Sequence, residues 1–277
     1  MGLGSIKVSG KKFNVKEEFG QLRLEIYNMN IKDISEIKGL DKLEKLYALD
    51  LSYNKLTKLK GLDVLPNLRQ LFLNNNQLTE LKGFDSLTNL DRIFLNGNQI
   101  SELKGLNKLI KLQWLEINKN KITELKGLDT LTNLIRLELQ ENKISKIKDL
   151  DTLTNLQVLI LSRNQISEIT GLDKMANLHT LHLDHNNITE IKGLDALANL
   201  SSLYLNNNKI TEIKGLDALA NLETLYLDNN QITEIKGLKH LGKLSLLYLG
   251  FNPIKGEFEK DIMGEENVQN FLKNYKE

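Results

Sequence analysis

Histidine and carboxylate side chains gather in one short stretch of the chain, where they could bind a metal ion. Three of the four histidines, His179, His182 and His185, lie close together in the sequence with Asp184 among them. Residues two apart in a strand point to the same face, so His182 and Asp184 could share a Zn²⁺ ion. No other stretch repeats this ligand pair, and the sequence has no cysteine. We therefore expect no metal site and no cofactor.

The other carboxylates follow a pattern that argues against catalysis. They recur at equivalent places, as in the copies of Thr-Glu-Ile-Lys at 189–192, 211–214 and 233–236. Catalytic carboxylates would occur at one place in the chain, outside the repeat, whereas carboxylates on a solvated face recur in every unit. The sequence also contains neither a GxSxG nucleophile turn nor a GxxxxGK[ST] phosphate loop. We predict that the chain is not an enzyme.

Composition narrows the classes of partner. The 277 residues include 37 basic and 36 acidic side chains, for a formal net charge of +1, so we expect no nucleic-acid partner. No apolar run approaches the ~20 residues of a membrane span. Residues 1–10 lack the apolar core of a signal peptide, so we expect no membrane association. The absence of cysteine fits a reducing compartment, and we expect a cytoplasmic location.

An internal repeat organises the chain. Residues 24–243 divide into ten units of 22 residues that read LxxLxLxxNxIxxIxGLDxLxN, and a partial eleventh unit begins at Leu244. The LxL spacing favours a strand, and the later spacings of three favour a short helical or 3₁₀ return path. One such coil cannot bury its own apolar side, so stacked coils must share a core. In the most degenerate unit the apolar slots are assigned to Leu24, Tyr27, Met29, Ile34, Ile37, Leu40 and Leu43.

Two further columns are interpreted as structural. From the unit that begins at Leu46 onward, the ninth position is asparagine. The chain turns inward there after the strand, and a buried amide can satisfy the backbone groups left unpaired. Glycine recurs seven residues later, where it predicts a positive φ or a close backbone contact, and Asp149 interrupts this column once. The asparagines are Asn54, Asn76, Asn98, Asn120, Asn142, Asn164, Asn186, Asn208, Asn230 and Asn252.

This pattern resembles the 22-residue class of leucine-rich repeats, which includes the phosphatase-regulatory SDS22-like proteins and the bacterial internalins. The Leu-Thr-Asn-Leu phrases at 87–90, 131–134 and 153–156 are similar to internalin repeats. The resemblance implies an α/β fold: a right-handed solenoid, arc- or horseshoe-shaped, with a parallel concave sheet and short 3₁₀ or helical convex segments. It also implies a concave surface that binds partner proteins, and no enzymatic activity.

The repeat framework predicts which side chains stand on the concave face, namely the third, fifth, seventh and eighth positions of each unit. The fifth-position column begins at Asn28 and includes a ladder of Tyr204, Tyr226 and Tyr248 on strands about 4.8 Å apart. The tyrosines either stabilise the sheet surface by stacking or anchor a partner. Charged residues between the aromatic zones either pair weakly across strands or specify a partner. The candidate binding residues are Phe72, Phe94, Trp114, Arg92, Glu116, Arg136, Glu138, His182, Tyr204, Tyr226 and Tyr248.

The two ends break the period and are expected to cap the array. Residues 1–23 form the predicted N-terminal cap, as a short strand pair or a helix, and 24–254 form the repeat array. Residues 255–277 form the predicted C-terminal cap. There Val268, Phe271, Leu272 and Tyr275 have helical spacing, and we expect the first three to pack on Leu244, Leu247 and Leu249 of the last coil. The Asn-Pro-Ile and Phe-Leu-x-x-Tyr phrases resemble the end of the repeat domain of Roco-type proteins.

Three functions fit the sequence. The leading hypothesis is an intracellular, monomeric scaffold that binds a protein partner on its concave face. A second is a regulatory subunit or sensor arm of a phosphatase or GTPase. A third is a structural or consensus-like array without a dedicated ligand, which the identical stretches 188–200 and 210–222 favour. The irregular concave face, with its single tryptophan and its clustered histidines, argues against the third.

Overall fold

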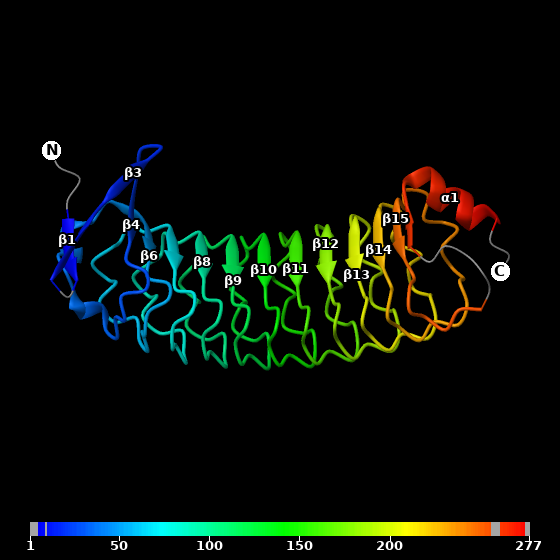
Figure 1. The fold of residues 1–277 in the computed structure, drawn as a ribbon, viewed down its shortest axis with the longest axis horizontal. Helices are drawn as coiled ribbons and strands as arrows, with labels where there is room; N and C mark the ends of the chain where they lie inside the picture. Colours follow the sequence, from blue (N-terminus) through cyan, green and yellow to red (C-terminus); the bar gives the residue numbers. More distant parts are fainter. Residues whose placement is uncertain (1–4, 9, 256–260, 275–277) are drawn as a thin grey trace. The chain divides into compact units, whose positions relative to one another are not determined.

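The computed structural model describes residues 5–8, 10–255 and 261–274, in two compact units that comprise 1–137 and 138–277. Each unit is a solenoid of stacked coils, and each coil carries one short strand (Figure 1). The eleven strands expected from the repeat are all present. In the first unit they are β4 (Gln21–Glu25), β6 (Leu46–Asp50), β7 (Gln70–Phe72), β8 (Arg92–Phe94) and β9 (Trp114–Glu116).

The second unit repeats the same arrangement. Strand β10 (Arg136–Glu138) contains the boundary between the units, and the strands of the second unit are β11 (Val158–Ile160), β12 (Thr180–His182), β13 (Ser202–Tyr204), β14 (Thr224–Tyr226) and β15 (Leu246–Tyr248). Within each unit the strands of neighbouring regular coils are parallel and in register at the repeat spacing of 22, so that Leu203 lies opposite Leu225.

The core of each unit is built from the repeating apolar slots. Their leucine and isoleucine side chains are almost completely buried; Leu71, Ile93 and Leu225, for example, have no exposed surface. Because every coil places the same side chain at the same height, these residues form continuous columns through the stack. This stacking confirms the predicted solenoid and its parallel sheet.

The predicted register of the first coil is wrong. Leu24 lies opposite Leu49, which is 25 positions further on, whereas Leu49 lies opposite Leu71 after 22. The core slots assigned to Tyr27 and Met29 are therefore filled by Leu24 and Ile26, and Tyr27 is 57% exposed. The first coil is three residues longer than the others.

The convex side also differs along the chain. The first coil has two 3₁₀ segments, η1 (Ile34–Glu36) and η2 (Leu40–Lys42), as the sequence predicts. In later described coils the return path consists of separate turns, for example with bonds from Leu197 N–H to Leu194 and from Leu200 N–H to Leu197. These bonds follow one another without overlapping, so they do not form a continuous 3₁₀ helix.

The asparagine column is structural, as predicted. The Asn208 side chain is buried, its Oδ1 accepts a bond from the Ile188 N–H at 3.0 Å, and its Nδ2 donates to Leu183 O at 2.9 Å and Leu205 O at 3.0 Å. Each amide therefore binds the preceding coil as well as its own. The same pattern recurs at Asn164, Asn186, Asn230 and Asn252 in this unit.

We expect Asn208→Ala to lower the free energy of unfolding by about 1–3 kcal/mol, because it removes three hydrogen bonds to buried backbone groups. Leu183 O and Leu205 O keep bonds from Asn186 and Asn230, whereas the Ile188 N–H loses its acceptor. The measurement is denaturant unfolding followed by circular dichroism. Asn199→Ala is the matched control, because this exposed amide makes one bond, to Ala176 O. Equal unfolding midpoints for the two variants would contradict the role assigned to the buried column.

A second asparagine column was not recognised as structural from the sequence. At the last position of the repeat, exposed amides donate to a backbone carbonyl 23 residues earlier, as Asn177 does to Thr154 O and Asn221 to Ala198 O. Where lysine replaces asparagine, Lys243 Nζ donates to Asn221 Oδ1 at 2.7 Å. The hydrogen bonds between neighbouring coils thus continue where lysine replaces asparagine.

The N-terminal cap consists of strand pairs, one of the two predicted alternatives. Strand β1 (Ser5–Val8) pairs antiparallel with β2 (Lys11–Asn14) and with β5 (Ile37–Lys38). Strand β3 (Lys16–Glu18) pairs antiparallel with β4. Ile6 and Val8 are buried, so the first coil does not leave an open apolar edge.

The C-terminal cap contains the predicted helix and a strand that the sequence did not predict. Helix α1 (Glu265–Asn274) contacts β15 and buries Val268 and Leu272, while Phe271 stays half-buried. Before it, β16 (Asp261–Met263) pairs antiparallel with β15. Tyr275 lies outside the described residues.

Candidate functional site

The candidate residues of the first unit form one group of stacked aromatic and arginine side chains. Phe72 and Phe94 stack with ring centroids 4.5 Å apart and planes within 1°, and Arg23 lies over Phe72 at 5.3 Å. The Trp114 ring follows at 6.0 Å from Phe94. Phe72, Phe94 and Trp114 lie on the neighbouring strands β7, β8 and β9, where the fifth and third positions of the repeat share one sheet surface. Arg23 lies on β4, two strands from Phe72.

Two arginines in the charged part of this group lie against the ring of Trp114. The guanidinium groups of Arg92 and Arg136 lie 5.4 and 5.0 Å from the Trp114 ring. Glu116 accepts bonds from Trp114 Nε1 and Asn96 Nδ2, both at 2.9 Å. The patch predicted as either ion pairs or a specificity region therefore has its cations held against the indole. We call these seven side chains the arginine face: Arg23, Phe72, Arg92, Phe94, Trp114, Glu116 and Arg136.

The predicted start of the fifth-position column is corrected by the longer first coil. Glu25, not Asn28, lies opposite Asp50 in the sheet. Asn28 is exposed and follows the strand at a positive φ of 56°. Glu25 forms ion pairs with Lys16 Nζ at 2.8 Å and with Arg23 Nε at 3.0 Å.

In the second unit the predicted tyrosine ladder is present and is one ring longer. The centroids of Tyr204 and Tyr226 are 4.8 Å apart, and those of Tyr226 and Tyr248 are 4.3 Å apart, with nearly parallel planes. His182 stacks on Tyr204 at 3.9 Å. The sequence places His182 next to Tyr204 in the fifth-position column, but only the structure shows that the two rings stack.

The ladder continues onto the capping strand. Tyr248 O–H donates to Met263 Sδ at 3.4 Å, and Met263 is 59% exposed. Burial first, and then the hydrogen bond with Tyr248, raises the pKa of Tyr226 to about 12, so this phenol stays protonated at neutral pH. We call this surface the tyrosine face: Val158, Ile160, Ser162, Thr180, His182, Asp184, Ser202, Tyr204, Asn206, Thr224, Tyr226, Asp228, Leu246, Tyr248, Asp261 and Met263.

Carboxylates flank the ladder in the seventh-position column. Asp184 accepts a bond from Ser162 Oγ at 2.6 Å and lies 3.7 Å from His182 Nδ1. Burial alone would raise the pKa of Asp184, but these contacts outweigh it and hold that pKa below its ordinary value. Burial raises the pKa of Asp228, and the charge of Asp261 raises it further.

The clustered histidines engage different partners. His179 Nδ1 lies 2.7 Å from Asn177 O, and His185 Nε2 lies 3.3 Å from Arg163. Among residues 5–8, 10–255 and 261–274, no three histidine or carboxylate side chains are placed to hold a metal ion.

Glu138, the last residue of β10, is half-buried at the start of the second unit.

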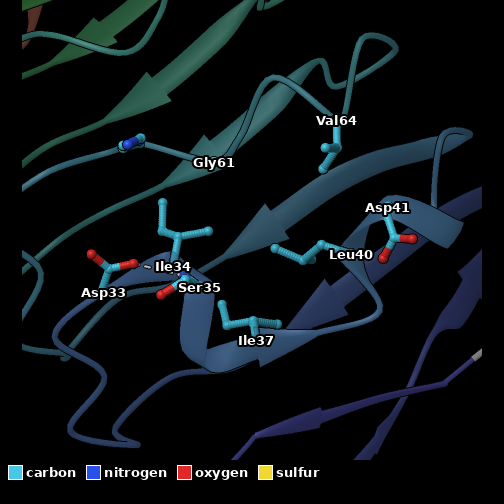
Figure 2. Close-up of a pocket in the computed structure, with 9 residues that line it drawn as sticks. Asp33, Ile34, Ser35, Ile37, Leu40, Asp41, Gly61 and Val64 are labelled. Carbon is cyan, nitrogen blue, oxygen red and sulfur yellow. Dashed lines mark hydrogen bonds between the residues drawn. The ribbon is translucent and has the colours of Figure 1, made fainter.

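A cavity that the sequence did not indicate lies on the return path of the first two coils. Figure 2 shows Ile34, Ile37, Leu40 and Val64 on its wall, and its volume is about 370 Å³. In a regular coil a Cβ on the column glycine would meet the preceding carbonyl, but on Gly61 it would meet the Ile34 side chain at 3.6 Å. The longer first coil thus leaves space beside the second.

Comparison with known proteins identifies the class of this chain. The family model for leucine-rich repeats in two copies matches residues 48–86, 66–108, 132–174, 154–196, 176–218, 198–240 and 220–260. These segments cover more than half of the chain, which therefore belongs to the leucine-rich-repeat family. Members of this family are typically protein-interaction domains without enzymatic activity. No curated protein sequence matches significantly.

Solved structures show the same fold. An internalin (inlF) from Listeria monocytogenes is 28% identical with a TM-score of 0.74, over 83% of this chain and 74% of the internalin. A chain in the octameric complex of latrophilin 3, Unc5D and FLRT2 is 24% identical with a TM-score of 0.75, over 85% and 76% of the two chains. A chain of the TLR13–ssRNA13 complex is 26% identical with a TM-score of 0.68, over 85% of this chain and 40% of that one.

Within the part of the chain that the structure describes, no helix is both long and apolar enough to cross a bilayer.

Proposed function

We propose that this chain binds a protein partner on the sheet surface of its coils and that it acts without catalysis. The observation that carries the proposal is the unbroken stack of His182, Tyr204, Tyr226 and Tyr248 on the solvent side of the second unit. The core does not require these rings, because the buried leucines of the same strands fill it. Aromatic side chains lose little rotamer freedom on binding and often anchor interfaces.

Both the arginine face and the tyrosine face are made of ordered side chains. Stacking fixes their rings before any partner arrives, so binding would cost little side-chain entropy. The solved complex of latrophilin 3, Unc5D and FLRT2 supports a protein partner, since a similar chain belongs to a protein assembly there. We further propose a cytoplasmic monomer, on the basis of the cysteine-free sequence, and a protein rather than a nucleic acid as ligand, on the basis of the balanced charge.

We expect Tyr204→Ser with Tyr226→Ser to weaken capture of the protein partner by about tenfold or more, which is ~1.4 kcal/mol. The measurement is affinity capture from native lysate, with each recovered protein quantified. Lys192→Ser is the control, because this exposed side chain lies on the return path and not on the sheet. If every protein recovered by the unmodified chain is recovered equally by the ladder variant, the proposal fails.

A further inference from the structure

We propose that the tyrosine face binds an extended segment of the partner protein that carries lysine or arginine side chains. This inference rests on the proposed function and specifies the chemistry of the partner. It follows from the charge of the face, from an underused carboxylate within it, and from the orientation of its rings.

The charge of the tyrosine face differs from that of the whole chain. The face carries three carboxylates, Asp184, Asp228 and Asp261, and neither lysine nor arginine, whereas the sequence has nearly equal numbers of basic and acidic residues. Arg163 lies at the rim of the face, where its guanidinium contacts His185. A cationic segment is thus attracted to this face although the protein as a whole has a formal charge of +1.

Asp228 has acceptor capacity that the described part of the chain does not use. Its Oδ2 accepts one bond, from Asn229 Nδ2 at 3.1 Å, while its Oδ1 is buried and has no hydrogen-bond partner among the described residues. Asp261 contributes a second negative charge nearby. A half-buried carboxylate beside a like charge is unfavourable, and an ammonium or guanidinium group at the accessible part of Asp228 would compensate that charge.

The rings of the ladder favour a peptide over a ligand with a flat ring. His182, Tyr204, Tyr226 and Tyr248 stack on one another, so their neighbours occupy the ring faces and their edges point to solvent. A nucleobase or a sugar needs an open ring face. The aliphatic stem of a lysine or arginine can lie along the ring edges while its charge reaches the carboxylate column.

The spacing of the carboxylates suits an extended chain that crosses the strands. Asp184 and Asp228 are two coils apart, roughly 9.6 Å at the usual strand separation. Alternate side chains of an extended segment lie about 6.8 Å apart, and the stems of lysine and arginine are long enough to span the difference. Two basic residues on the same side of the segment can therefore reach both carboxylates.

The test uses the full chain and fluorescein-labelled peptides of alternating lysine and threonine or of alternating glutamate and threonine. Fluorescence anisotropy is measured for the unmodified chain, for Asp184→Asn with Asp228→Asn, and for the matched control Asp195→Asn with Asp217→Asn. The control aspartates are exposed residues of the return path, outside the sheet. Asparagine keeps the shape of the side chain and can still accept a bond from Ser162, and circular dichroism checks folding.

We expect the lysine peptide to bind about tenfold or more tightly than the glutamate peptide, and to weaken as salt increases. The Asp184/Asp228 variant should lose about tenfold in affinity, while the control changes by less than about twofold. Equal binding of the two peptides, or full binding by the Asp184/Asp228 variant, overturns the inference. If the tyrosine variant still loses the native partner in that case, the proposed function stands and only the basic character of the partner is wrong.

Discussion

Replacing Gly105 by alanine is expected to lower the free energy of unfolding by about 3 kcal/mol or more. Its φ is +106°, which an L side chain rarely adopts, and an added Cβ would clash with Leu81 O. The obstacle is backbone of the preceding coil rather than the end of a flexible side chain. The coils would have to separate, and separation would weaken the buried leucine contacts on both sides.

Denaturant unfolding of the full chain measures this effect. Gly242→Ala is the control, because a Cβ there meets nothing within 4 Å and its φ is not in the left-handed region. We expect the control to change stability by less than about 1 kcal/mol. If Gly105→Ala unfolds at the same denaturant concentration as the unmodified chain, the coils do not pack as closely as the structure shows.

The replacement of one column glycine by Asp149 follows from the same geometry. In the second unit this column has φ values of 61–70°, and Asp149 itself has 61°, which aspartate tolerates. In the first unit the corresponding glycines have φ values of 95–106°. The sequence predicted a positive φ along the column, but nothing in the repeated motif signals that the two units differ in its magnitude.

The second large effect is expected from Val268→Asp, which should cost about 3–5 kcal/mol. Val268 has no exposed surface, and an aspartate there would be a buried charge without a partner. Helix α1 is also held by Gln269 Nε2, which donates to Leu241 O at 3.0 Å and Leu244 O at 3.3 Å. Loss of the helix would uncover the apolar end of the last coil and promote aggregation.

Size-exclusion chromatography with light scattering detects this aggregation, and thermal unfolding detects the loss of stability. Asn270→Asp is the matched control, since Asn270 lies on the exposed side of the same helix. A Val268→Asp protein that stays monomeric and as stable as the control would show that the helix does not cap the array.

The structure of the regular coils can be predicted well from the sequence, because each repeated position has one kind of side chain and one environment. Leu203 and Leu225 occupy the same slot and are found opposite each other, and the amide of Asn208 satisfies the groups that the strand ending leaves unpaired. The first coil was misassigned because both Ile26 and Tyr27 are compatible with a strand, so apolar spacing alone does not fix the register. Burial by the neighbouring coil decides between them.

The sequence predicts where the candidate site lies on the sheet, but not all of the contacts between its side chains. The column that contains Tyr204 was located from the leucines beside it, whereas its extension to His182 depends on side-chain rotamers. The contributions of Asp261 and Met263 were missed because β16 lies outside the repeat and forms only by pairing with the backbone of β15. Short strands of this kind have little signal of their own in a sequence.

The buried amides make the stack directional and fix the step by which its length can change. Each asparagine satisfies an N–H of the coil before it, as Asn230 does for Ile210, so every interior coil relies on its successor. Gaining or losing a whole 22-residue unit between regular coils preserves all of these bonds. The longer first coil keeps its bond to the next coil by using Ile31, whose N–H donates to Asn54 Oδ1 at 3.1 Å. The array can therefore change in length during evolution by duplication or deletion of interior coils. The capping segments occur once each in the sequence, so they must be kept when the number of coils changes.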